Sequence, residues 1–290
     1  MITIFTPTFN RKEKLKRLYQ SICRQTFSDY EWLIIDDGSF DDTEKYINEI
    51  KRENDRIRYY KQNNSGKHVA FNNGIEKAKG DIFICVDSDD CLTADALKKI
   101  QEIHKKYSNN SSICGYVFQK GTDINKPLYK HYKEKEFIEN YNKYIINGGF
   151  KGDKCEVFIT RILKKYRFPI FDNEKFLSEG FLWSRIGKKY NYVFIDDIIY
   201  LCEYLENGLT KQGKKLRINN PLGGMNHAAE FLNKDFNYKV RIKNSILYLV
   251  YGQFAKIKLK ELIKKSNDKA LLIICIIPSM LLKRIWEIKY

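Results

Sequence analysis

Over the first 107 residues, short apolar runs of β type alternate with stretches of helical periodicity, and this alternation constrains the fold most strongly. Runs of strand length are expected at residues 2–6, 32–35, 57–60 and 82–86. The helical pattern predicts helices at residues 12–23, 41–52, 69–79 and 94–106. Strands that alternate with helices form βαβ units, whose strands lie parallel in one sheet. The pattern therefore predicts an α/β fold with a mostly parallel sheet, typical of nucleotide-binding proteins.

The rest of the chain is less regular. Further strands are predicted at residues 113–118, 155–160 and 192–204, and a further helix at residues 179–190. From about residue 219 the sequence is Lys-rich and has a helical pattern. We therefore predict one α/β domain over residues 1–215, made of halves 1–107 and 108–215. A basic, helical C-terminal extension over residues 216–290 is expected to follow it.

A largely apolar run of thirteen residues, Ala270–Leu282, stands near the end of this extension. A membrane-spanning helix needs about 20 such residues, so the run is too short to cross a bilayer. Basic residues flank it on both sides, namely Lys264, Lys265, Lys269, Lys283 and Arg284. This arrangement predicts peripheral contact of residues 256–290 with an anionic membrane surface. The alternative is a run that packs inside the fold or in a homodimer.

The seven cysteines are scattered and form no CxxC pair. This usage favours a reducing compartment over a disulfide framework or a thiolate zinc site. The chain starts with MITIFTPTFNR, a strand-like run without the basic and apolar regions of a signal peptide. We therefore expect a cytoplasmic protein, and the basic extension predicts a place at the inner face of the cell membrane.

The formal net charge of +16 is large for 290 residues. Such a field attracts nucleic acid, anionic lipid or phosphorylated substrates, and charge alone does not separate these partners. A nucleic-acid-binding protein is therefore one alternative. It leaves the acidic residues that follow two of the predicted strands unexplained, so we expect no nucleic acid as a partner.

These acidic residues follow the second and fourth predicted strands. Asp36 and Asp37 end the second strand in LIIDDGS, and Asp87, Asp89 and Asp90 end the fourth strand in FICVDSDD. Open α/β sheets bind ligands beyond the carboxyl ends of their strands, so both clusters are expected at one binding edge. If the strand stays extended, Asp87 and Asp89 point to one face and suit a Mg²⁺ or Mn²⁺ ion shared with a diphosphate. The alternative is an ordinary turn before the next helix.

Five motifs that include these clusters follow one another along the chain: TPTFNR, QTFSDYEWLIIDDGSFDDT, NSGKHVAFNNGI, AKGDIFICVDSDD and SEGFLWSRI. Their ordered combination resembles the family 2 glycosyltransferases over roughly residues 1–190. The resemblance implies a GT-A fold, which is Rossmann-like, and a metal-dependent transfer with inversion at the sugar. The implied donor is a UDP-sugar, and the implied acceptor is a glycan or lipid-linked glycan of bacterial surface polysaccharide synthesis.

The resemblance also implies which residues hold the nucleotide of the donor. They are the loop after the first strand and the second aspartate of the DDGS turn, here Pro7, Thr8, Asn10, Arg11 and Asp37. The chemistry is consistent, because an aspartate carboxylate can accept the N3 proton of uracil.

For the diphosphate of the donor, the resemblance implies a second group of residues. Lys67 matches the basic residue that approaches the phosphates, although an ordinary surface lysine is the alternative. In the segment Asp87, Ser88 and Asp89, the first aspartate matches the residue at the ribose or at a metal-bound water. Asp89 matches the direct ligand of Mn²⁺ or Mg²⁺.

The catalytic base is implied at a helix start, where family members often carry a Glu-Asp pair. Here the pair is Glu179 and Gly180, so Glu179 becomes the candidate base, with Asp153 in reserve. An acid that stabilises the helix dipole is the alternative for Glu179. Trp183 and Arg185, further along that predicted helix, are candidate contacts to the acceptor, with packing as the alternative for the tryptophan.

Two further alternatives concern the activity itself. A sugar-phosphate nucleotidyltransferase also combines an α/β fold with carboxylate-bound metal, but its glycine-rich basic loop after the first strand is missing here. A glycosyltransferase-like scaffold without activity is the other alternative, because Gly180 replaces the expected aspartate.

Overall fold

The computed structural model describes residues 1–202, 209–266 and 268–290. Within these residues the chain forms two compact units. The first comprises residues 1–140, 151–167 and 189–202, and the second comprises residues 141–150, 168–188 and 209–290. The chain passes between the units several times, and the division at residue 215 stays a prediction.

Four parallel strands form one half of the sheet of the first unit. Their order is β3-β2-β1-β4, with β1 in the middle and paired in parallel with both β2 and β4. The bounds are β1 (Ile2–Thr8), β2 (Tyr30–Asp36), β3 (Ile57–Lys61) and β4 (Ile82–Cys85). Each of these strands coincides with a predicted one, so the βαβ interpretation of the first half of the chain is confirmed.

The other half of the sheet is mixed. The order continues β9-β6-β10-β5, and only β6 and β10 pair in parallel. The bounds are β5 (Cys91–Leu92), β6 (Ile113–Asp123), β9 (Lys154–Ile159) and β10 (Asn191–Leu201), with short β7 (Lys126–Pro127) and β8 (Glu136–Glu139) at the side. The sheet is therefore less parallel than expected, because β9 pairs antiparallel with both of its neighbours, β4 and β6, and β5 pairs antiparallel with β10. The predicted end of the last strand, Tyr204, lies outside the described residues.

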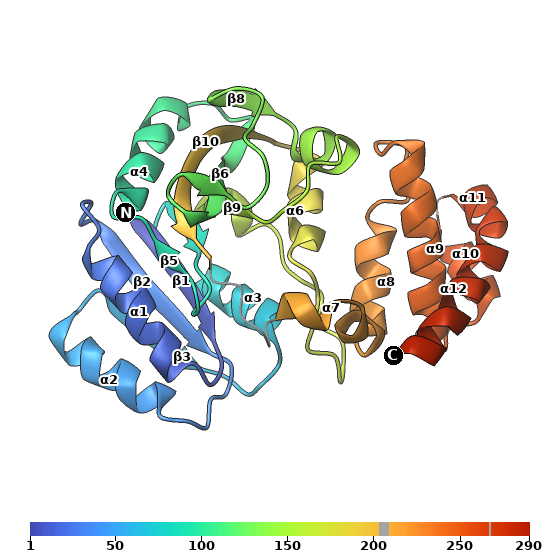
Figure 1. Cartoon of the computed structure of the whole chain (residues 1–290), viewed down its shortest axis with the longest axis horizontal. Helices are drawn as coiled ribbons and strands as arrows, with labels where there is room; N and C mark the ends of the chain where they lie inside the picture. Colours follow the sequence, from blue (N-terminus) through green and yellow to red (C-terminus); the bar gives the residue numbers. More distant parts are fainter. Residues whose placement is uncertain (203–208, 267) are drawn as a thin grey trace. The chain divides into compact units, whose positions relative to one another are not determined.

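Helices cover both faces of this sheet (Figure 1). On one face, α1 (Lys12–Cys23), α2 (Thr43–Glu53) and α4 (Ala96–Tyr107) contribute their buried leucines and isoleucines to one cluster with the strands. The opposite face carries α3 (Lys67–Lys77), whose Phe71 packs against Phe5 and Phe83 with ring centroids 5.2 and 5.4 Å away. A further helix, α5 (Thr160–Leu163), is short and directly follows β9.

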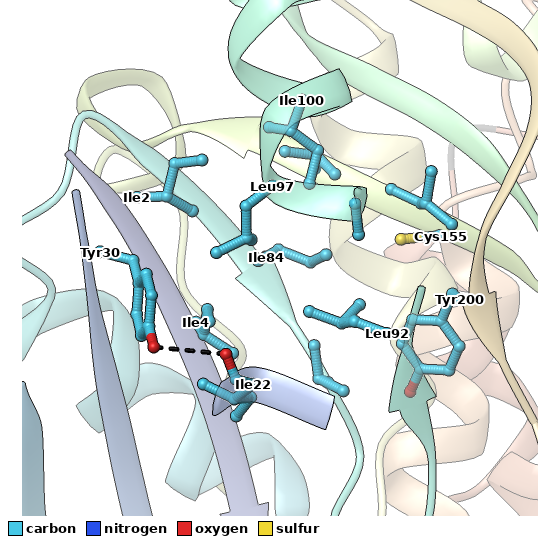
Figure 2. Packing of buried hydrophobic residues seen from close by; sticks show 14 of the residues in the cluster. Ile2, Ile4, Ile22, Tyr30, Ile84, Leu92, Leu97, Ile100, Cys155 and Tyr200 are labelled. Carbon is cyan, nitrogen blue, oxygen red and sulfur yellow. Dashed lines mark hydrogen bonds between the residues drawn. The ribbon is translucent and has the colours of Figure 1, made fainter. Parts of the chain in front are cut away.

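Figure 2 shows the packing on the first of these faces. Ile4 of β1, Ile84 of β4, and Leu97 and Ile100 of α4 are fully buried members of this cluster. Side chains of β-branched type suit such a strand face, and their burial is the main stabilising term of the unit. Tyr200 of β10 belongs to the same cluster, and its hydroxyl reaches the binding edge described below.

The second unit is helical, as expected for the C-terminal extension. A π-helix (Asn142–Asn147) and the helices α6 (Gly180–Gly187), α7 (Leu209–Ile218) and α8 (Pro221–Ala229) come before the longest described helix of the unit, α9 (Tyr238–Phe254). The chain ends with α10 (Leu259–Lys265), α11 (Lys269–Ile274) and α12 (Ile276–Lys289). Among the described helices, none combines the length and the apolar character needed to cross a lipid bilayer.

Candidate functional site

The carboxyl ends of β1, β2 and β4 lie next to one another in the first unit. Thr8, the last residue of β1, is in register with Asp36, the last residue of β2. The backbone N–H of Asp37 donates to the carbonyl of Thr8 at 2.8 Å, and that of Val86 donates to the carbonyl of Phe5 at 2.8 Å. Both acidic segments therefore leave the sheet at the same edge, where open α/β sheets bind ligands.

Asp37 fastens the loop that leads into α3. Its Oδ1 accepts hydrogen bonds from Gln62 Nε2 at 2.7 Å and from the N–H of Ser65 at 2.8 Å. Its Oδ2 accepts the N–H of Gly66 at 2.8 Å. A carboxylate has about four acceptor positions, so three of them are used inside the protein. The side chain is 6% exposed, and an open hollow lined by Gly38 and the segment from Lys61 to Asn64 lies beside it.

The loop held by Asp37 brings Lys67 to the second acidic segment. Lys67 directly follows Gly66 and begins α3, and its Nζ lies 2.5 Å from Oδ1 of Asp87. Burial alone would raise the pKa of Asp87, but the charges of Lys67 and Lys120 outweigh it and lower the pKa. Asp87 is therefore ionised at neutral pH, and the structure brings three of the predicted residues, Asp37, Lys67 and Asp87, into one connected network.

The segment from Asp87 to Asp90 forms a turn, which corrects the expectation of an extended strand. The strand β4 ends at Cys85, and the N–H of Asp90 donates to the carbonyl of Asp87 at 3.1 Å. Asp87 and Asp89 therefore do not share a face through strand alternation. Aspartate and serine favour such turns because their side chains hydrogen-bond nearby backbone groups, and they occupy all four positions of this turn.

The turn gives Asp87 and Asp89 different partners. Asp87 meets Lys67, whereas Oδ2 of Asp89 lies 3.9 Å from Nη1 of Arg11. A guanidinium N–H of Arg17 also donates to the carbonyl of Asp89 at 3.1 Å, which fixes the backbone of the turn. The predicted residue Ser88 is 6% exposed and lies inside the turn.

The loop after β1 is attached to the DDGS turn by hydrogen bonds. The N–H of Asn10 donates to Oγ of Ser39 at 2.8 Å, and Oδ1 of Asn10 accepts the N–H of Phe40 at 3.0 Å. Asn10 has a φ of 52°, a left-handed value that asparagine tolerates better than most residues. Pro7 is buried just before this loop. Oγ1 of Thr8 is buried and has no hydrogen-bond partner within the described residues, so a ligand bound here has a hydroxyl group to satisfy.

Two residues that sequence patterns did not indicate, Tyr200 and Lys120, complete this edge together with Asp90. The hydroxyl of Tyr200 donates to Oδ2 of Asp90 at 2.8 Å and accepts the N–H of Asp87 at 2.9 Å. Nζ of Lys120, on β6, lies 4.0 Å from the centroid of the Tyr200 ring. Burial, and next the charge of Asp87, raise the pKa of Asp90 to about 6. Burial works against the charge of Lys120, but Asp87 and Asp90 raise its pKa and keep it protonated.

The donor set at this edge fits a hard divalent cation that is shared with a substrate. The side chains of Asp87 and Asp89 are 31% and 24% exposed and offer only oxygen ligands. Within the described residues no group of three or more His, Cys, Asp or Glu side chains is placed to hold a metal by itself. Such a cation would therefore take most of its ligands from a diphosphate and water, as Mg²⁺ and Mn²⁺ usually do.

The candidate base and acceptor contacts lie in the second unit. Glu179 is half-buried directly before α6, and its carbonyl accepts the N–H groups of Leu182 at 2.9 Å and Trp183 at 3.2 Å. Trp183 is 5% exposed, which fits packing, and Nε of Arg185 donates to Oε1 of Glu230 at 2.8 Å. The reserve residue, Asp153, belongs to the first unit and is exposed.

Gly180 marks the position where the sequence departs from the family pattern. A Cβ atom at Gly180 would lie 3.3 Å from Nε2 of His227, on α8. The ring of His227 therefore occupies the space beside Gly180. Burial lowers the pKa of His227 to about 4, helped by the charges of Arg217 and Lys243, so the imidazole is neutral at pH 7. Sequence spacing gave no reason to connect these two residues.

Four parallel strands, with acidic segments after β2 and β4 and cations around them, form an α/β protein of the GT-A type. Staphylococcus aureus TarS (residues 1–349) has a similar fold, with a TM-score of 0.64 at 18% identity over 95% of this chain and 80% of that one. The model of the family Glycosyl transferase family 2 matches residues 3–167. The chain belongs to this family and is a glycosyltransferase.

Two curated relatives come from bacterial glycan synthesis. A GalNAc(5)-diNAcBac-PP-undecaprenol beta-1,3-glucosyltransferase of Campylobacter jejuni is 27% identical, over 99% of this chain and 97% of the relative. Poly(ribitol-phosphate) beta-N-acetylglucosaminyltransferase TarP of S. aureus is 28% identical, over 62% of this chain and 53% of the relative. The nucleic-acid-binding and nucleotidyltransferase alternatives find no support in these similarities.

Proposed function

We propose that this glycosyltransferase moves a sugar from a UDP-sugar to a lipid-linked glycan acceptor in bacterial surface polysaccharide synthesis. The main support for a nucleotide diphosphate donor is the binding edge, where Lys67, Arg11 and Lys120 surround the turn of Asp87 and Asp89. The relatives support the substrates, since one TarS structure contains UDP-GlcNAc and the C. jejuni relative is named for an undecaprenol-linked glycan.

The donor would lie across the carboxyl ends of β1, β2 and β4. The base of the nucleotide would take the side of Asp37 and Thr8, where one carboxylate position and a buried hydroxyl remain for it. The diphosphate would take the side of Lys67 and Arg11, because cations stabilise its charge.

Asp89, with Asp87 beside it, is the proposed holder of Mn²⁺ or Mg²⁺. A bound divalent cation would neutralise the charge that develops on the departing diphosphate. Structures of related folds support this proposal, since a mannosyltransferase of Pyrobaculum calidifontis, similar at a TM-score of 0.59, contains GDP-Man and Mn²⁺.

The proposed reaction is a single displacement at the anomeric carbon with inversion. The oxygen of the acceptor hydroxyl forms a bond to that carbon while the bond to the diphosphate oxygen breaks, and UDP leaves. Glu179 is the proposed base that takes the hydroxyl proton, a role that usually contributes about 10²- to 10⁴-fold to the rate. Gly180 has no side chain, so Glu179 supplies the carboxylate at this helix start. The ring of His227 lies in the space beside Gly180.

Thermal shift with a panel of nucleotide sugars, each with and without Mn²⁺, tests the donor and the metal. We expect a UDP-sugar to raise the melting temperature with Mn²⁺ and hardly at all without it. Asp89→Ala should abolish this rise, whereas Asp55→Ala, at an exposed position of the same unit, should keep it. Stabilisation by GDP-sugars instead, or an unchanged rise in Asp89→Ala, would contradict the proposal.

Release of UDP in the presence of an acceptor tests the base. Glu179→Gln should keep the ligand-induced rise in melting temperature but lose about 10²-fold or more of the turnover. Asp172→Asn, an exposed acid of the same unit, is the matched control and should retain turnover. Normal turnover in Glu179→Gln would remove this residue from the mechanism, and no turnover in the unaltered chain with any donor would indicate an inactive scaffold.

A further inference from the structure

The outer side of the last helices is apolar and exposed. Six large side chains between residues 274 and 288 are 53–81% exposed, and together they define the C-terminal apolar face: Ile274, Ile277, Met280, Leu281, Ile285 and Ile288. Within α12, Ile277, Leu281 and Ile288 follow at helical spacing and therefore share one side of the helix. Exposed apolar residues of the described chain are otherwise scattered, so this concentration indicates an interaction surface.

The opposite side of α12 is already packed against the protein. Trp286 is 4% exposed and its ring centroid lies 5.7 Å from that of Tyr251, on α9. Ser279 is fully buried, and its Oγ accepts a hydrogen bond from Nε2 of Gln253 at 3.2 Å. The core of the unit is thus complete without the outer side, and packing inside the chain does not explain why that side is apolar.

Positive charge surrounds the C-terminal apolar face. Residues 256–290 contain nine Lys and Arg residues against three Asp and Glu residues. Arg284 is exposed and lies four residues after Met280, which places it on the same side of α12. Exposed lysines continue along α10 and its ends, namely Lys256, Lys258, Lys260, Lys264, Lys265 and Lys269. An apolar helix side with a basic border fits the interface of an anionic lipid bilayer.

We propose that the C-terminal apolar face inserts into the headgroup region of an anionic membrane and that its basic border binds the lipid phosphates. A second copy of the chain is a poorer occupant. A twofold contact would place the same basic border on both sides of the interface, where like charges repel. The inference deepens the proposed function, because a lipid-linked acceptor is available only at a membrane surface. The biological purpose of membrane binding rests on the proposed function, but the binding itself does not.

Flotation of the full chain with vesicles tests this surface without any donor or acceptor. Vesicles of phosphatidylcholine alone are compared with vesicles that contain about one-third phosphatidylglycerol, at about 0.1 M and about 0.5 M salt. We expect binding to the anionic vesicles only, and weaker binding at the higher salt because the basic border is screened. Equal binding to both kinds of vesicle, or to neither, would overturn the proposal.

A matched pair of double variants distinguishes vesicle binding through this face from nonspecific binding through other exposed apolar residues. Ile277→Ser with Leu281→Ser should weaken vesicle binding about tenfold or more, since two inserted apolar side chains are lost. Ile138→Ser with Ile170→Ser alters two side chains that are 44% and 64% exposed elsewhere and should change it less than about twofold. Unchanged binding in the first variant would overturn the proposal.

Sedimentation without vesicles examines the second-copy occupant. The chain could form a dimer and fail to bind vesicles. If Ile277→Ser with Leu281→Ser then converted the dimer to a monomer, the face would be assigned to self-association, and the membrane proposal would be overturned. The thermal shift with UDP and Mn²⁺ should be the same in both double variants and in the unaltered chain. A failure of donor binding is thereby distinguished from a failure of lipid binding.

Discussion

Asp37 illustrates how one acidic side chain can serve the fold and a ligand together. Its carboxylate accepts hydrogen bonds from the N–H groups of Ser65 and Gly66, which sets the path of the chain into α3. Lys67 comes next and reaches Asp87. In addition to its proposed contact with the nucleotide, Asp37 therefore positions the ammonium group of Lys67 at the diphosphate end of the proposed site.

Lys120 is expected to strengthen donor binding through its charge. Lys120→Met keeps most of the apolar stem but removes the cation that faces Asp87 and Asp90, so two acidic groups would oppose the incoming diphosphate. We predict about tenfold weaker UDP-sugar affinity, measured by calorimetry with Mn²⁺. Lys130→Met, at an exposed position, is the control and should leave the affinity unchanged. Equal affinity in both variants would exclude Lys120 from the donor site.

His227 should make stability depend on pH in a defined direction. Its pKa is lowered to about 4 in the folded chain, mainly by burial, so above that pH the folded state does not bind this proton. An unfolded histidine, with a pKa of about 6.5, binds it, and stability is therefore lost as the pH falls from about 6.5 to about 4.

Thermal unfolding from pH 7.5 down to pH 4.5 measures this effect. The melting temperature of His227→Gln should fall less steeply over this range than that of the unaltered chain. Gln20, an exposed residue that does not titrate, supplies the control, and Gln20→Asn should keep the slope of the unaltered chain. Parallel curves for all three proteins would show that His227 is not buried in its neutral form.

At the scale of elements, α3 matters because its beginning carries Lys67 and its side packs on β1. Gly74 allows this close packing, since a Cβ atom there would lie 2.4 Å from the ring of Phe5. The helix can therefore lie directly on the strand that leads to Thr8. The position of Lys67, the cation proposed to bind the donor phosphates, depends on that contact.

Gly74→Ala should destabilise the chain, against the general trend for glycine in helices. Alanine normally favours a helix interior by about 1 kcal/mol, but here overpacking against Phe5 should cost about 1–3 kcal/mol. We expect a melting temperature several degrees lower, by differential scanning calorimetry. Glu76→Ala, at an exposed position of α3, should leave it nearly unchanged. A higher melting temperature in Gly74→Ala would mean that α3 sits further from β1.

At the scale of the whole molecule, the functional groups divide between the two units. Asp37, Lys67, Asp87, Asp89 and Lys120 all belong to the first unit. Glu179 and the C-terminal apolar face belong to the second. Donor binding and lipid binding can therefore be altered separately by substitution, which makes the two proposals independent in experiment.

The sequence alone determined the elements of the first half and the kind of protein. Hydrophobic periodicity is a local property, so the helix Lys12–Cys23 and the parallel strands around β1 follow from residues close in sequence. The acidic residues after β2 and β4 were also predictable, because topology alone puts strand ends at one edge.

Only the tertiary structure decided the contacts between distant segments. Tyr200 reaches Asp90 across 110 residues of chain, and Lys120 joins them from β6, which no local pattern encodes. The ring of His227 beside Gly180 and the exposed side of α12 likewise depend on the tertiary structure. A side chain's partners depend on which distant surfaces pack together, and packing is a property of the folded chain as a whole.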